Sequence, residues 1–341
     1  MYKTTIKFIK QLVDTKKIPG ASYAFISKEN LVNEVYGNKE LVPNEVILEK
    51  GTLYDMASLT KVICTTTVIL QLVERKLIEI DAPFKKYLPE FLDEEVTIRE
   101  LLTHTSDINP YIPNRDELNK EELRDAILNL TSGNERGKKV VYTDTGTVLL
   151  GFLIEELFKK PAQYVFLEEI LKPLEMNQSG FSLSDKKNIA PTEVTKKRSI
   201  IKGEVHDPKA FVLAETCGSA GLFSSVEDSL HFVQMMLQKG IYKGTRLLKE
   251  QTILSLLESY TLGDCPKRSL GWDLLPFDGR FILYHTGYTG TFMIIDILEE
   301  EAFIFLSNRV HPVDNREEYL KLRDELIKIY LSERQEREKM L

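Results

Sequence analysis

The hydrophobic pattern of this 341-residue chain changes its period twice along its length, and this change constrains the fold more than any other feature. An amphipathic helix is expected at residues 4–16, and a charged one from Asp314 to the end. The strand-like ranges are 21–27 and 31–36 near the start, and 270–275, 281–285, 291–297 and 302–306 near the end. Between them, residues 82–260 have mostly helical patterns. We therefore predict a mixed α+β fold with one antiparallel sheet, flanked by helices and built from both chain ends.

The helical middle of the chain predicts an inserted domain. We expect residues 1–81 and 262–341 to form the sheet domain and residues 82–261 to form a mostly helical insertion. A ligand site is expected in the cleft between two such parts. The basic stretch at 186–209 is expected on the surface.

Residues 54–63 begin as a polar turn and continue into a long apolar helix. Ser58 lies near the start of that helix, and Lys61 follows one turn later on the same face. A serine hydroxyl needs a neighbouring base to become a nucleophile, and a partly desolvated lysine can help. The alternative is a helix-capping serine followed by a surface lysine. Two other Ser-x-x-Lys matches, starting at Ser184 and Ser199, show that the spacing alone is weak.

Three more polar stretches accompany this segment. They are Tyr142-Thr143-Asp144 before an apolar helix at 146–158, His285-Thr286-Gly287-Tyr288 on and after a strand, and Leu101-Leu102-Thr103-His104-Thr105-Ser106. With Ser58 and Lys61, the ordered set resembles the serine β-lactamase and penicillin-binding-protein superfamily, on the side of the class C β-lactamases and related esterases and peptidases. The resemblance covers nearly the whole chain and implies acyl transfer at a serine with no cofactor.

The resemblance also implies roles for the matched residues. Ser58 would form the acyl-enzyme. Lys61 and Tyr142 would share the proton transfer, with Tyr142 the preferred base, because adjacent positive charge favours a phenolate. The backbone N–H groups of Ser58 and Tyr288 would form the oxyanion hole.

The strand segment and Asp144, two residues after Tyr142, imply how substrate would bind. Thr286 and Gly287 would let an extended substrate lie along the strand edge. Asp144 replaces the asparagine of the family, and an ionised carboxylate only accepts hydrogen bonds; near Lys61 it would favour the charged ammonium. His285 replaces a lysine, and a histidine is mostly neutral at pH 7. Both changes disfavour a dedicated β-lactamase and leave acyl transfer possible.

We therefore expect a serine hydrolase that cleaves an ester or amide bond through an acyl-enzyme at Ser58. Two alternatives stay open: a D-Ala-D-Ala-type carboxypeptidase or β-lactamase with the same chemistry, and an inactive relative that only binds a ligand. His104 is interpreted as a structural loop residue satisfied by hydrogen bonds. His206 either lines the cleft or stabilises a turn, and His285 could be a structural strand residue.

The resemblance implies a small-molecule or peptide-like substrate as the partner. A net charge of −7 argues against nucleic acid. The longest apolar run, 62–73, is too short to span a bilayer. Three widely spaced cysteines, no metal-binding spacing and no convincing signal peptide predict a cytoplasmic protein with no metal site. The oligomeric state is not predicted.

Overall fold

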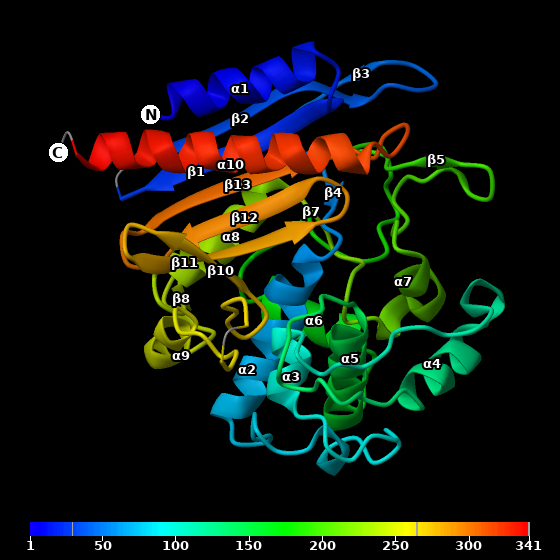
Figure 1. Cartoon of the computed structure of the whole chain (residues 1–341). Coiled ribbons are helices and arrows are strands. Elements are labelled where there is room, and N and C mark those ends of the chain that lie inside the picture. Colours follow the sequence, from blue (N-terminus) through cyan, green and yellow to red (C-terminus); the bar gives the residue numbers. More distant parts are fainter. Residues whose placement is uncertain (29, 264, 340–341) are drawn as a thin grey trace.

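The computed structural model describes residues 1–28, 30–263 and 265–339. The chain forms a central sheet with two helices on one face and a larger helical layer on the other (Figure 1). The strands, in their order across the sheet, are β10 (Asp273–Phe277), β11 (Arg280–Gly287), β12 (Thr291–Asp296), β13 (Glu301–Ser307), β1 (Gly20–Ser27), β2 (Asn30–Glu40) and β3 (Val46–Ile47).

The strands from the two ends of the chain meet inside the sheet. The first strand, β1, pairs antiparallel with β13 on one side, with Ala21 opposite Ser307, and with β2 on the other. All neighbouring strands of this sheet are antiparallel. The predicted α+β class, with a sheet built from both ends, is confirmed.

Two long helices cover one face of the sheet, α1 (Lys3–Asp14) and α10 (Arg316–Glu338). They lie side by side (Figure 1), because the backbone N–H groups of Thr4 and Thr5 donate to Glu333 of α10 at 3.0 and 2.9 Å. Aromatic side chains of the sheet fill the space beneath them, among them Phe25 and Phe303, whose ring centroids are 4.5 Å apart.

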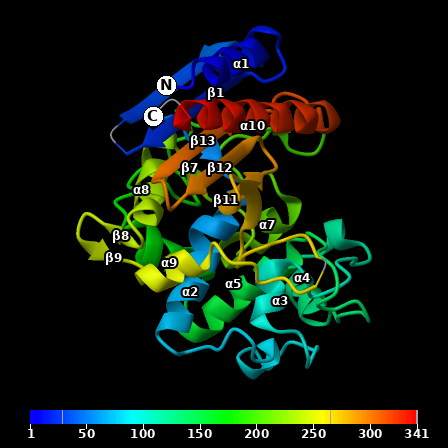
Figure 2. The ribbon, with the colours of Figure 1, turned by 60° about the vertical axis from the view of Figure 1, so that its left-hand side comes forward.

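The opposite face of the sheet packs on α8 (Val226–Leu237) and on the helical layer (Figure 2). That layer contains the π-helical turn η1 (Lys61–Thr66), α2 (Thr67–Glu74), α3 (Ile98–Thr103), α4 (Lys120–Leu128), α5 (Thr145–Phe158), α6 (Ala162–Phe166), the π-helical turn η4 (Leu167–Leu171), α7 (Pro208–Leu213) and α9 (Glu250–Ser255). The short 3₁₀ turns are η2 (Phe84–Lys86), η3 (Arg115–Glu117) and η5 (Ala214–Thr216).

Some element boundaries differ from the predicted ones. The helix expected from Ser58 begins at Lys61, and its first turn is a π-helix, a form common at functional sites. β10 starts at Asp273 instead of Leu270. Small two-stranded sheets interrupt the predicted helical middle: β4 (Tyr54–Asp55) with β7 (Phe223–Ser224), β5 (Val194–Thr195) with β6 (Ser199–Ile200), and β8 (Ile241–Tyr242) with β9 (Thr245–Arg246).

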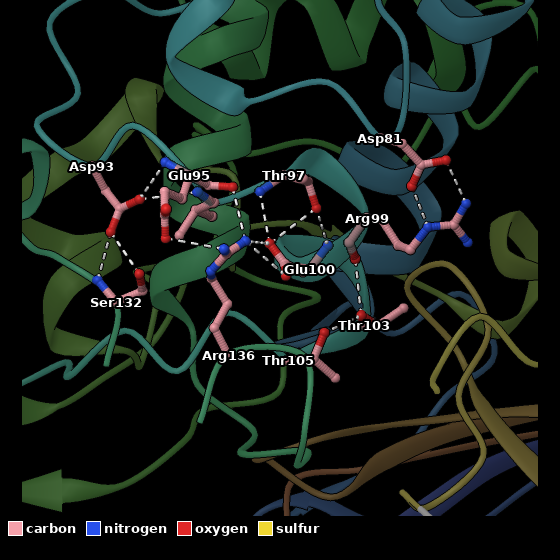
Figure 3. A network of polar contacts seen from close by, with 11 residues as sticks. Asp81, Asp93, Glu95, Thr97, Arg99, Glu100, Thr103, Thr105, Ser132 and Arg136 are labelled. Carbon is pink, nitrogen blue, oxygen red and sulfur yellow. Dashed lines mark hydrogen bonds and ion pairs between the residues drawn. The ribbon is translucent and has the colours of Figure 1, made fainter. Parts of the chain in front are cut away.

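A polar network fixes the N-terminus of α3, whose other end lies at the site (Figure 3). Thr97 caps the helix by accepting a hydrogen bond from the N–H of Glu100, and Glu100 accepts one in return from the N–H of Thr97, at 2.8 Å. Arg136 also binds Glu100 and pairs with Glu95 at 3.0 Å. The cap orients α3 so that the residue after it, His104, lies deep in the fold.

The predicted division at residues 82 and 261 stays a prediction. Within the described ranges, no helix has both the length and the apolar composition that crossing a membrane requires.

Candidate active site

The loop that carries Ser58 is held in a strained conformation by Asp55. Ala57, directly before the serine, has a φ of 46° in the left-handed region that a residue with a Cβ rarely adopts. One carboxylate oxygen of the buried Asp55 accepts from the N–H of Ala57 at 2.8 Å, and the other accepts from the N–H of His206 at 2.7 Å. Asp55 therefore stabilises the turn and joins it to the segment before α7.

Lys61 lies in η1, one turn after Ser58, and its side chain is only 1% exposed. Its ammonium donates to the hydroxyl of Ser58 at 2.6 Å, to the carbonyl of Ser219 at 2.9 Å and to Asp144 at 2.9 Å. An ammonium has three donors, and all three are used. Burial alone would lower the pKa of Lys61, but the Asp144 carboxylate outweighs it and raises the pKa above its usual value. The alternative of a capping serine with a surface lysine is wrong.

Asp144, at the start of α5, is shared between two lysines. One of its oxygens accepts from Lys61, and the other accepts from Lys209 of α7 at 2.6 Å. Burial would raise the pKa of Asp144, but the two ammonium groups outweigh it and hold the pKa well below its usual range. Lys209 belongs to the stretch predicted to lie on the surface, and its amine instead reaches into the site. That surface prediction is also wrong for Ile189 and Ile201, which are buried.

Tyr142 stands over the Lys61 ammonium, with its ring centroid 5.5 Å from the nitrogen. The side chain is 47% exposed, so it borders the solvent. His104 packs against it with ring centroids 4.4 Å apart, and His285 approaches to 6.2 Å. Among the described residues, no side-chain hydrogen bond of His104 is found; its contact is with the tyrosine ring, so the predicted hydrogen-bonded loop role does not describe it.

His285 points from β11 toward the same cluster and is 1% exposed. Burial, together with the positive charges of Arg268 and Lys61, holds its pKa well below the usual value. The ring is therefore neutral near pH 7. Its Nε2 is buried and has no hydrogen-bond partner in the described part of the chain.

The turn after β11 places Tyr288 beside the serine. Arg309 donates to the carbonyl of Tyr288 from Nε at 3.0 Å and from Nη2 at 2.6 Å, and Thr289 donates to the carbonyl of Asp55 at 2.7 Å. These bonds fix the turn against the Ser58 loop. In the ranges that the structure describes, the backbone N–H groups of Ser58 and Tyr288 donate to no other protein group, as an oxyanion hole requires.

The need for glycine at position 287 has a structural explanation other than the expected approach of a substrate. A Cβ at this position would lie 2.1 Å from the hydroxyl of Thr291 and 2.5 Å from the carbonyl of Met56. The close approach that requires glycine is therefore to the backbone next to Ser58. Thr286 and Gly287 both line the cavity in front of Ser58.

A cavity of about 740 Å³ opens in front of Ser58. Its lining includes Tyr142, His206 and Tyr288. The ring of His206 stacks on that of Tyr288 with centroids 5.6 Å apart, so His206 belongs to the cleft. Basic side chains outnumber acidic ones in the lining; the basic ones are Arg268, Arg309, Arg316 and Arg323, and the acidic ones are Asp144, Asp207 and Asp273. Three of these arginines, Arg268, Arg309 and Arg323, form ion pairs with aspartates.

Arg268 was not found from the sequence. It is 4% exposed, lines the cavity, and pairs with Asp273 through Nη1. Its Nε and Nη2 are buried without a partner among the described residues. The missing lysine at position 285 could have prompted a search for another cation, but the sequence offers 45 lysines and arginines and no way to choose among them. The other Ser-x-x-Lys matches lie away from this site: Ser184 and Ser199 are exposed.

Comparisons with known proteins identify the family of this chain. A family model described as Beta-lactamase matches residues 5–326. An N-acetylmuramyl-L-alanine amidase of Bacillus subtilis (strain 168) is 27% identical over 89% of this chain and 77% of its own, and an Escherichia coli (strain K12) protein named as a candidate D-alanyl-D-alanine carboxypeptidase is 28% identical over 89% and 81%. The structure of a β-lactamase/D-alanine carboxypeptidase from Pseudomonas syringae superposes with a TM-score of 0.77 at 17% identity, covering 96% of this chain and 98% of that one. The chain belongs to the Beta-lactamase family.

Proposed function

We propose that this hydrolase of the Beta-lactamase family cleaves an amide or ester bond through an acyl-enzyme at Ser58, on a substrate that carries a carboxylate. The observation that carries the proposal is the position of Lys61, whose ammonium donates one of its three hydrogen bonds to the hydroxyl of Ser58 at 2.6 Å. A buried lysine held in this way orients the serine and supplies positive charge beside it.

The reaction follows from which groups can accept a proton. The charged ammonium of Lys61 has no lone pair to receive the proton of Ser58, so Tyr142, in its phenolate form, takes the proton as the serine oxygen attacks the substrate carbonyl. The N–H groups of Ser58 and Tyr288 stabilise the negative charge on the carbonyl oxygen. Tyr142 then returns the proton to the leaving group, and water hydrolyses the acyl-enzyme by the same route.

The cation for substrate recognition would be Arg268 in place of the neutral His285. Its two unpaired nitrogens can form a forked pair of hydrogen bonds with a carboxylate. This favours a peptide-like substrate with a free C-terminal carboxylate over a neutral ester, in agreement with relatives named as an amidase and as carboxypeptidases. The neutral His285 still disfavours a dedicated β-lactamase. A cytoplasmic location stays a prediction.

Steady-state hydrolysis of a substrate panel tests this proposal. The panel contains an N-acylated D-alanyl-D-alanine, a p-nitrophenyl ester of a short acid, and a penicillin. We expect the peptide to have the highest kcat/KM and Ser58→Ala to abolish its turnover. Undiminished turnover by Ser58→Ala would refute the nucleophile, and a preference for the neutral ester would refute the substrate class. Binding of the peptide without turnover by the wild type would favour an inactive relative.

A further inference from the structure

Lys209 is fixed in place by the start of α7. Asp207 caps this helix by accepting a hydrogen bond from the N–H of Ala210 at 2.8 Å, and Pro208 occupies the first turn. The lysine side chain that follows is only 21% exposed, and its ammonium lies 2.6 Å from Asp144. The chain thus brings a second lysine to the carboxylate from a helix 65 residues further along the sequence.

The two oxygens of Asp144 are divided between two ammonium groups. Lys61 lies 2.9 Å from one oxygen, and Lys209 lies 2.6 Å from the other. Lys209 therefore shares the negative charge of Asp144 with Lys61, and the three groups together keep one net positive charge. Without Lys209, Asp144 would form a closed pair with Lys61, and the positive charge beside Ser58 would be largely lost.

We propose that Lys209 is a positioning residue for the reaction at Ser58. By pairing with Asp144, it makes an Asp–Lys pair of no net charge, so that the carboxylate orients Lys61 while the positive charge of Lys61 remains available to Ser58 and Tyr142. The inference rests on the proposed function, because it concerns the charge that the same reaction uses.

The charged and titratable groups around Lys61 come from several elements. Lys209 differs from the others because it forms an ion pair with Asp144. Besides Asp144, the groups that act on Lys61 or share its cluster are Tyr142, Asp207, His104, His285 and Arg268. In the described part of the chain, only Lys61 and Lys209 form ion pairs with Asp144. Removing the charge of Lys209 therefore changes the net charge of the Asp144–Lys209 pair.

The pH dependence of kcat/KM with the best panel substrate tests the proposal. Lys209→Met should move the acid limb upward by about one pH unit, with about a tenfold loss of rate below the limb, because a nearby positive charge is removed. The acid limb moves in the same direction whether Tyr142 or Lys61 must lose its proton for the reaction. Asp144→Asn should move the limb downward, and the double variant Asp144→Asn/Lys209→Met should return it toward the wild-type value.

Two controls separate charge from folding. Lys209→Arg keeps the ion pair and should restore the limb toward the wild-type pH. Lys197→Met removes an exposed lysine that lines another cavity together with Lys209 and has no ion pair among the described residues, and its limb should not move. Thermal unfolding checks that each variant is folded.

An unmoved limb in a folded Lys209→Met, or a double variant no closer to the wild type than the single variants, would overturn the inference. If Lys209→Met does not fold, the inference is overturned when the limb of the double variant lies no closer to the wild-type pH than the limb of Asp144→Asn. The proposed function fails separately, if Ser58→Ala retains turnover.

Discussion

Replacing Arg268 by methionine should remove recognition of the substrate carboxylate while keeping the volume of the side chain. The structure leaves Nε and Nη2 of this buried arginine without partners. A hydrogen bond to a charged group contributes about 1.5 kcal/mol or more, so two of them amount to about 3 kcal/mol. We expect kcat/KM for a carboxylate substrate to fall about 100-fold.

A pair of substrates isolates this contribution. The assay compares N-acyl-D-alanyl-D-alanine with its C-terminal amide, which lacks the carboxylate. Arg268→Met should lower kcat/KM for the acid and barely change it for the amide. Arg323→Met is the matched control, because it removes the same charge from the same cavity at a position on α10, and it should cost less than about threefold since a partly exposed charge contributes little. Equal losses for acid and amide in Arg268→Met would refute the reasoning.

Three other perturbations follow from the site. Tyr142→Phe should lower kcat by about 10²-fold or more without lowering the melting temperature, because the ring is half exposed; retained kcat would exclude it as the base. Gly287→Ala should destabilise the fold by about 2 kcal/mol, seen as a lower melting temperature, because its Cβ would meet the carbonyl of Met56 at 2.5 Å and the hydroxyl of Thr291; an unchanged melting temperature would contradict this. Since the folded-state pKa of Asp144 is depressed, its stabilisation is complete above the usual value of 3.8 and is lost as the pH falls through the folded-state pKa, so the free energies of unfolding of wild type and Asp144→Asn should converge in acid; a constant difference would contradict the ion pairs.

The periodicity of the sequence was enough to predict the layers of the fold. Short apolar runs mark β12 and β13, which are buried on both faces, and longer apolar segments mark α5 and α8. The π-helical turn η1 could not be predicted, since its backbone depends on tertiary contacts. The short strands of the small sheets also escaped detection, because two residues carry no period.

The site was predicted where the chemistry is local in sequence. Ser58 and Lys61 are three residues apart, so the spacing predicted that their side chains lie together, although the helix begins only at Lys61. Lys209 and Arg268 reach the site from distant segments, and nothing in their own surroundings marks them. The role of Gly287 could not be predicted, since it depends on how closely β11 approaches the backbone before Ser58.

The covalent intermediate is the most direct test of the central claim that Ser58 is the nucleophile. Intact mass would be measured for the wild type and for Ser58→Ala after incubation with a fluorophosphonate and with a p-nitrophenyl ester, followed by peptide mapping. We predict one adduct on the wild type, mapped to Ser58, and none on Ser58→Ala. An adduct of equal yield on Ser58→Ala, or no adduct on a wild-type protein that turns over its substrate, would contradict the mechanism.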